Sequence, residues 1–200
     1  MAAARNIEAI VIGGSAGALE ALGMFLPDLP REFSIPIALV VHLPPTKPSV
    51  VPNVLGARCA LHVKEPDDKE PLVPATLYVA PPNYHLLIEK NRSFSLSVDD
   101  PVLFSRPSID VLFESAADAY GPGLAGVLLT GANEDGARGL RRIKDAGGLT
   151  IVQSPATAAV ATMPEAALRH GKPSHVLPLQ KIGAFLAHLD GSTRGNEALE

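Results

Sequence analysis

The sequence contains five short, almost wholly apolar runs that are bounded by glycine or proline. These runs are Ile7–Ile12, Ile35–Val41, Thr76–Ala80, Leu124–Leu129 and Leu149–Val152. Continuous apolar runs of this length are typical of strands buried on both faces, as in parallel sheets. Parallel neighbours need a crossover connection, usually a helix, and the helices then cover the sheet. The sequence therefore predicts an α/β fold with a doubly wound, mostly parallel sheet and helices on both faces.

Helical spacing fills most of the segments between these runs. The predicted helices are Ala16–Leu26, Ser49–Arg58, Ser108–Ala119, Glu134–Asp145, Pro164–His170 and Leu179–Leu189. Ser108 is the expected N-cap of its helix, and Gly147 is expected to end the helix before it. A polar turn between the period-2 segments Tyr84–Glu89 and Ser93–Val98 predicts one antiparallel hairpin.

Composition limits the classes of function. The length of 200 residues suits one domain, residues 1–190, and a polar tail, residues 191–200, which we expect to be disordered. The formal charge of −4, with scattered basic residues, argues against nucleic-acid binding. A single cysteine, Cys59, excludes an intramolecular disulfide, and no signal peptide or transmembrane run is recognisable. We therefore expect a cytoplasmic protein with no membrane insertion, no cofactor and no metal ion.

The first apolar run leads into Gly13-Gly14-Ser15-Ala16-Gly17, a turn that suits a phosphate cradle or a nucleophile. The spacing departs from G-x-G-x-x-G, and the second run ends at His42 instead of the acid that binds a ribose. The pattern is G-x-S-x-G, in which glycines permit a sharp strand-to-helix turn that exposes the serine. Ser15 is thus a candidate nucleophile, with nucleotide binding and a simple helix cap as the alternatives.

A base and an acid stand at the exits of two other apolar runs. His42 follows Ile35–Val41, and Asp135 lies in the loop after Leu124–Leu129. Because the carboxyl ends of parallel strands share one edge of a sheet, Ser15, His42 and Asp135 are expected to meet there. Taken singly, His42 also suits a packed core histidine, and Asp135 a first-turn or capping acid beside Glu134.

Two further residues deserve separate interpretations. His85 also comes just after an apolar run, so it either faces the site or lies on the surface of the hairpin. Cys59 has no accompanying histidine motif and is interpreted as a small, buried residue.

Six segments carry a recognisable pattern when they are taken together. They are VIGGSAGALEAL, VVHLPP, LYVAPPNYHLLI, RPSIDVLFESAA, GVLLTGANEDGARGL and MPEAALRHG. In these segments and in their order, the chain resembles a known family, the chemotaxis protein-glutamate methylesterases (CheB). The resemblance implies a Ser–His–Asp hydrolase that removes methyl groups from γ-glutamyl methyl esters on chemoreceptor signalling helices, and that also deamidates certain receptor glutamines. Catalytically degenerate binding to a receptor or signalling partner, and small-molecule ester hydrolysis, remain alternatives.

The same resemblance implies roles for individual residues. Ser15 would be the nucleophile, His42 the general base and then acid, and Asp135 the residue that orients the imidazole. The backbone N–H groups of Ala16 and Ala132 would form the oxyanion hole. Two further residues would line the site, His85 and Arg106.

The chain also departs from the family's usual pattern. Alanine stands at 16, 18 and 132 where threonine, glycine and methionine are usual, and Asn133-Glu134 replaces Gly-Asn. None of these changes removes a member of the triad. Family members often carry an N-terminal receiver domain, but the first catalytic strand here begins at residue 7. We therefore expect a stand-alone domain that is active without phosphorylation, with a receiver domain that was removed or lies on another chain as the alternative. Phosphodonor dependence would contradict the expected activity without phosphorylation.

Overall fold

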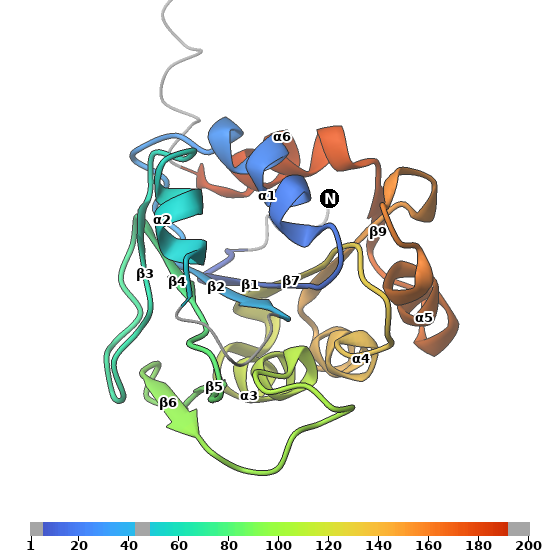
Figure 1. Ribbon diagram of the computed structural model, residues 1–200. Coiled ribbons are helices and arrows are strands. Elements are labelled where there is room, and N and C mark those ends of the chain that lie inside the picture. The colour runs from blue at the N-terminus through green and yellow to red at the C-terminus, as the bar shows by residue number, and fades with distance from the viewer. Residues whose placement is uncertain (1–5, 43–48, 192–200) are drawn as a thin grey trace, which may run out of the picture.

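The computed structural model describes residues 6–42 and 49–191. Its centre is a seven-stranded sheet in the order β3-β4-β2-β1-β7-β8-β9, in which every neighbouring pair is parallel (Figure 1). The strands are β1 (Ala9–Gly14), β2 (Ile37–Val41), β3 (His62–Lys64), β4 (Thr76–Val79), β7 (Leu124–Leu128), β8 (Leu149–Gln153) and β9 (His175–Leu177). A separate antiparallel pair consists of β5 (His85–Ile88) and β6 (Phe94–Ser97).

Helices cover both faces of the sheet (Figure 1). The helices are α1 (Ala18–Phe25), α2 (Val51–Gly56), α3 (Ile109–Tyr120), α4 (Ala137–Asp145), α5 (Thr162–His170) and α6 (Leu179–Leu189). Short 3₁₀ turns are η1 (Leu26–Asp28), η2 (Gly121–Gly123) and η3 (Pro155–Thr157). Residues of α1, α2 and α6 pack in one core, and residues of α3, α4, α5 and the hairpin pack in the other.

The alternation of side chains along β1 explains why there are two cores. Ile10 and Ile12 point into the core with α1, whereas Ala9 and Val11 point into the core with α3. All six residues of β1 are buried, as expected for a central parallel strand. The predicted doubly wound α/β fold with one antiparallel hairpin is confirmed.

The two edge strands are the elements that the sequence did not predict. Each has three residues, and each carries exposed side chains, such as His62 in β3 and Val176 in β9. A half-exposed strand of three residues lacks the apolar run on which the prediction relied. The predicted helices exist, but three of them begin two or three residues later than expected, at Ala18, Val51 and Ala137. Helix α5 begins two residues earlier than expected, at Thr162. The predicted tail from residue 192 onward lies outside the described residues.

The order of the strands fixes where a site can form. Strand β1 lies between β2 and β7, and the chain leaves β1 toward one side of the sheet and later fills the other. In open α/β sheets, ligands bind beyond the carboxyl ends of the strands at such a switch point. The loops that follow β1, β2 and β7 therefore share the expected position, and they carry Ser15, His42 and Asp135.

Candidate active site

The turn after β1 presents Ser15 at the carboxyl edge of the sheet. The Ser15 N–H donates to the Thr130 carbonyl at 2.9 Å, and the Ser15 carbonyl accepts from the Ala18 N–H at 2.9 Å. The N-cap of α1 is Gly17, whose φ of 80° favours glycine, so Ser15 is not the cap of this helix. The Ser15 side chain is half-buried, and its hydroxyl forms no hydrogen bond with any other residue that the structure describes.

His42 lies beside Ser15 on the neighbouring strand. Gly14 pairs with Val41 in the sheet, and the His42 N–H donates to the Gly14 carbonyl at 3.2 Å. Ser15 and His42 are therefore the next residues in register, on strands that are about 4.8 Å apart. The two sequence-predicted residues thus start from adjacent backbone positions.

The imidazole of His42 has different partners at its two nitrogens. Nε2 lies 2.8 Å from Oδ2 of Asp135, and Nδ1 lies 3.4 Å from the Ser105 hydroxyl. With Asp135 as a carboxylate, Nε2 carries the proton that it donates, so a neutral His42 has its basic lone pair on Nδ1. Nδ1 is therefore the nitrogen that is able to accept a proton from a nucleophile.

The carboxylate of Asp135 is fully buried and accepts four hydrogen bonds. Besides His42, its donors are the Ser108 hydroxyl at 2.9 Å and the N–H groups of Ile109 at 2.7 Å and Asp110 at 3.0 Å. These donors belong to the N-terminus of α3, where free N–H groups and the helix dipole favour an anion. Asp135 is not the cap of α4, because Gly136 occupies that position.

Asp110 binds the start of α4 in the same way that Asp135 binds the start of α3. From the first turn of α3, its Oδ1 accepts the N–H groups of Gly136 at 3.0 Å and Gly139 at 2.7 Å, at the start of α4. Each helix start is thus held by a carboxylate from the other segment. Gly139 suits this close approach, because a Cβ atom there would lie 2.6 Å from Cβ of Phe113.

The two buried acids have opposite pKa shifts. Burial raises the pKa of Asp110 to about 6, with a further rise from the Asp135 charge and partial offset by the Gly139 hydrogen bond and Arg138. Burial also acts to raise the pKa of Asp135, but hydrogen bonds from His42, Asp110 and Ile109 outweigh it, and the net pKa is lowered. Asp135 therefore remains charged at neutral pH, as an orienting acid requires.

The expected oxyanion donors occupy exposed loop positions. Ala16 follows Ser15 directly, and Ala132 lies in the loop after β7. Within residues 6–42 and 49–191, neither N–H group donates to another protein group. The loop at Ala132 is fixed through its neighbour Gly131, which donates to the Val160 carbonyl and accepts from the Met163 N–H. Both N–H groups are thus available to a ligand beside Ser15.

A pocket of about 160 Å³ adjoins His42. Its lining residues are His42, Asn83, Pro101, Phe104, Ser105, Arg106 and Pro107. Arg106 donates through Nη1 to the carbonyls of Val98 at 2.8 Å and Asp99 at 3.1 Å, so it fastens the loop as well as lining the pocket.

His85 lies behind this loop and is only 2% exposed. Its Nδ1 accepts the Ser108 N–H at 3.2 Å, and its Nε2 lies 3.1 Å from the Asp100 carbonyl. It therefore holds both ends of the segment that carries Ser105. The structure places His85 next to the Asp135 network and does not place it on the wall of the pocket.

Ser105, Ser108 and Asp110 were not assigned a place in the site from the sequence. Ser108 was expected only as an N-cap, a role that its bond from the Val111 N–H confirms. Ser108 and Asp110 belong to the RPSID segment that carries the family resemblance, and Ser105 directly precedes it, but the motif alone predicts none of their contacts. Elsewhere, Cys59 is partly buried, and burial raises the pKa of its thiol. No three His, Cys, Asp or Glu side chains among the described residues gather closely enough to hold a metal ion.

An α/β domain with a histidine–carboxylate pair at its switch point, beside a serine in a glycine-rich turn, has the arrangement of a hydrolase. The model of the family described as CheB methylesterase matches residues 10–186. The chain therefore belongs to the CheB methylesterase family.

Individual relatives agree with this assignment. A Leptospira interrogans protein, provisionally named protein-glutamate methylesterase/protein-glutamine glutaminase, is 49% identical over 185 residues, which are 92% of this chain and 96% of that protein. A protein-glutamate methylesterase/protein-glutamine glutaminase of Anaeromyxobacter dehalogenans is 38% identical, over 90% of this chain and 52% of its own length. The chain thus spans nearly all of one relative and about half of the other.

A solved structure shows the same fold. The CheB methylesterase catalytic domain of Thermotoga maritima superimposes with a TM-score of 0.87 and 34% sequence identity, covering 92% of this chain and 98% of that one. Within the described parts of the chain, no helix has the length and hydropathy that crossing a bilayer requires.

Proposed function

We propose that this chain hydrolyses γ-glutamyl methyl esters on the signalling helices of chemoreceptors, with Ser15, His42 and Asp135 as its catalytic triad. The observation that carries the proposal is the 2.8 Å contact between His42 Nε2 and the buried Asp135, on the strand next to Ser15. Relatives named for glutamate methylesterase and glutamine glutaminase activity support the class of substrate. Because the proposed substrate is the cytoplasmic part of a chemoreceptor, the protein would act in the cytoplasm. Residues 1–190 would be its catalytic domain.

In the first half of the reaction, the Ser15 hydroxyl attacks the ester carbonyl carbon while His42 Nδ1 takes its proton. The resulting oxyanion accepts hydrogen bonds from the N–H groups of Ala16 and Ala132. Collapse breaks the bond to the methoxy oxygen, which takes the proton from Nδ1 and leaves as methanol. A glutamyl ester on Ser15 remains.

In the second half, Nδ1 removes a proton from water as the water attacks this acyl group. Collapse returns the proton to Ser15 and releases the glutamate side chain as a carboxylic acid, which ionises at neutral pH. A glutamine substrate would follow the same steps with ammonia as the first product. Asp135 stays ionised throughout, keeps the proton on Nε2 and stabilises the imidazolium form of His42.

The free hydroxyl of Ser15 does not conflict with this mechanism. In the absence of substrate, the hydrogen bonds used in catalysis are often long, and they shorten in the reacting complex. Small side chains at Ala16 and Ala132 leave the backbone donors in place, although they leave more space around the reacting group than threonine and methionine would. Degenerate binding without turnover, and hydrolysis of small esters alone, are the two competing outcomes of the test below.

The test is methanol release from a methylated cytoplasmic fragment of a methyl-accepting chemoreceptor. Ser15→Ala is expected to lower kcat at least about 1,000-fold, because the attacking oxygen is lost. Ser95→Ala is the matched control, since Ser95 lies on β6 and contacts Lys69. No release from folded wild type would favour the degenerate binding domain. Turnover of small esters without release from the fragment would favour the small-molecule esterase.

A further inference from the structure

The segment that lines the pocket beside His42 contains a tight two-residue turn with an apolar tip, Leu103-Phe104. Val102 and Ser105 exchange both backbone hydrogen bonds, at 3.1 Å and 2.8 Å, and so close the turn. Leu103 and Phe104 have φ angles of 47° and 63°. Positive φ at both central residues is the geometry of a type I′ turn, which Asn-Gly adopts with far less strain than Leu-Phe.

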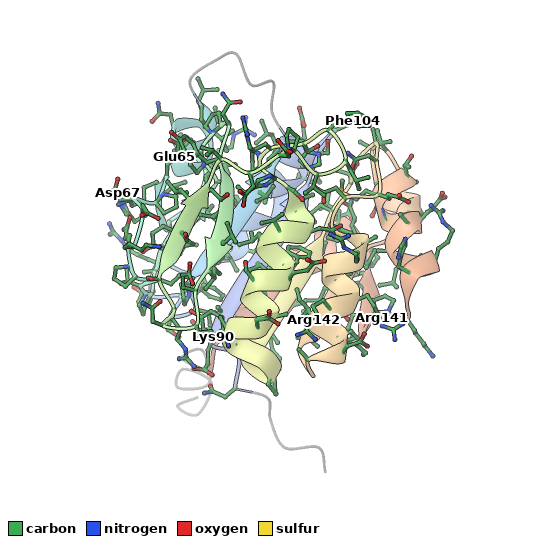
Figure 2. All side chains as sticks on the ribbon, turned by 90° about the horizontal axis from the view of Figure 1, so that it is seen from below. Glu65, Asp67, Lys90, Phe104, Arg141 and Arg142 are labelled. Atoms are coloured by element: carbon green, nitrogen blue, oxygen red, sulfur yellow. The ribbon has the colours of Figure 1, made fainter. Side chains whose placement is uncertain are left out.

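The tip is also unusually exposed. Phe104 is 104% exposed, as much as in an isolated peptide, and Leu103 is 43% exposed. Figure 2 shows Phe104 at the outer rim of the molecule, at the opposite end of the α3–α4 layer from Arg141 and Arg142. Exposed apolar side chains are normal when they are scattered, but a strained turn that lifts a phenyl ring into water needs a reason.

The turn is held firmly at its base. Arg106 bonds the carbonyls of Val98 and Asp99, and His85 bonds the Asp100 carbonyl. The tip therefore projects from a fixed support, and a partner that meets it need not order the segment first. A rigid aromatic side chain of this kind is a common anchor in protein recognition, because few torsion angles are lost on burial.

The turn lies beside His42, so the molecule that would contact its tip is the one that binds at the candidate active site. Phe104 lines the same pocket as His42, and the adjacent Ser105 is the residue whose hydroxyl lies 3.4 Å from Nδ1. A protein segment that brings an ester to the base His42 is therefore expected to pass close to this turn. The ring offers only apolar surface, so a matching segment must place an apolar side chain there.

Given the proposed function, we infer that Leu103-Phe104 forms an apolar wedge that selects protein substrates with an apolar side chain beside the glutamyl ester. On a helical substrate, side chains three or four positions apart are about 5–6 Å apart on one face. A neighbour on the same face of the substrate helix, three or four positions from the ester-bearing glutamate, is the side chain that we expect to meet Phe104. The occupant is the substrate helix itself, and the wedge sets specificity without touching the reacting atoms.

The test compares Phe104→Ala with Phe104→Leu on two substrates, the methylated receptor fragment and p-nitrophenyl acetate. Phe104→Ala is expected to lower kcat/KM for the fragment about 10-fold or more, mainly by raising KM, and to affect the small ester much less. Phe104→Leu should retain most of the activity on the fragment. Leu168→Ala is the matched control, because Leu168 is an exposed apolar residue of α5 outside the pocket.

A second arm changes the substrate. Replacing the apolar residue three or four positions from the ester with serine should lower kcat/KM for wild type, and should have much less effect on Phe104→Ala, because the lost contact is the same. The wedge is overturned if Phe104→Ala leaves the KM for the fragment unchanged. It is also overturned if both substrates lose the same factor, since the turn would then act on His42.

Binding separates this inference from the proposed function. The affinity of the unreactive Ser15→Ala form for the fragment is measured with and without Phe104→Ala. A loss of about 10-fold or more supports the wedge even if wild type releases no methanol. Equal affinity, or no binding by either form, overturns it for this substrate.

Discussion

The two sides of the His42 imidazole differ sharply in how they are held. On the Nε2 side, Asp135 is fully buried, lies 2.8 Å away and accepts three further hydrogen bonds from the start of α3. On the Nδ1 side, the only contact among the described residues is the Ser105 hydroxyl at 3.4 Å, on an exposed turn.

This contrast separates orientation from reaction. A carboxylate with four donors has little freedom, so it fixes the ring and the position of its proton. The Nδ1 side has a long, weak contact that a serine hydroxyl or a water molecule is able to replace. A base that serves a nucleophile in one step and water in the next needs one nitrogen held and the other exchangeable.

The largest effect on activity is expected from a change on the Nε2 side of His42, at Asp135. Asp135→Asn should lower kcat by about 10³–10⁴-fold, because the amide no longer stabilises the charged ring or keeps its proton on Nε2. Methanol release measures the loss, and urea unfolding shows whether the variant remains folded. Asp118→Asn is the matched control, since Asp118 is an exposed acid of α3 that pairs with Arg142. Full activity of folded Asp135→Asn would mean that another group orients His42.

A smaller effect, on stability, is expected from changes at Asp110, which binds the start of the helix that follows Asp135. Asp110→Ala should lower the free energy of unfolding by about 2–4 kcal/mol, because the N–H groups of Gly136 and Gly139 lose their buried acceptor. Asp110→Asn keeps an oxygen acceptor and should lose much less. Urea unfolding at pH 7 measures both variants. Equal losses would show that the charge, and not the acceptor, is what α4 requires.

The raised pKa of Asp110 gives this pair of variants a pH signature. Between its usual value of 3.8 and about 6, the folded protein holds a proton on Asp110 that the unfolded chain has released. Stability from this group is therefore present below pH 3.8 and is lost as the pH rises through about 6. The unfolding free energy of Asp110→Asn should thus rise relative to wild type across this range. A flat or falling difference would contradict the shift.

The smallest effect on activity is expected from a change on the Nδ1 side of His42, at Ser105. Ser105→Ala should change kcat/KM by less than about 10-fold, since a neutral hydrogen bond contributes about 0.5–1.5 kcal/mol and the reacting hydroxyl or water replaces this one. Labelling with a serine-reactive phosphonate should still modify Ser15. Ser95→Ala again serves as the control. If Ser105→Ala abolished labelling, Ser105 would be the nucleophile and the two sides of the ring would need new assignments.

Much of this arrangement could be predicted from the sequence, because it depends on the ends of buried strands. The apolar runs located β1, β2 and β7, and a shared sheet edge then brought the residues after them together. The fold and the contact between His42 and Asp135 followed from that logic.

The remaining features depend on contacts that no periodicity encodes. Asp135 suits a cap of its own helix by sequence, but its carboxylate accepts the N–H groups of Ile109 and Asp110 at the start of α3, 26 and 25 residues earlier in the chain. The inward-facing bonds of His85 and the strained turn at Phe104 arise from the path of one irregular segment. The edge strands β3 and β9 are too short and too exposed to leave an apolar signal.

The hydrogen bonds of Asp135 to the start of α3, and of Asp110 to the start of α4, couple the opening of the two helices. Each helix start donates N–H groups to a carboxylate beside the other, so a partial opening that frees one helix start also removes hydrogen-bond partners from the other. In the proposed mechanism, His42 would then lose its orienting acid in the same event. The proposed catalysis therefore depends on the integrity of this helix pair, and partly opened molecules are expected to be inactive.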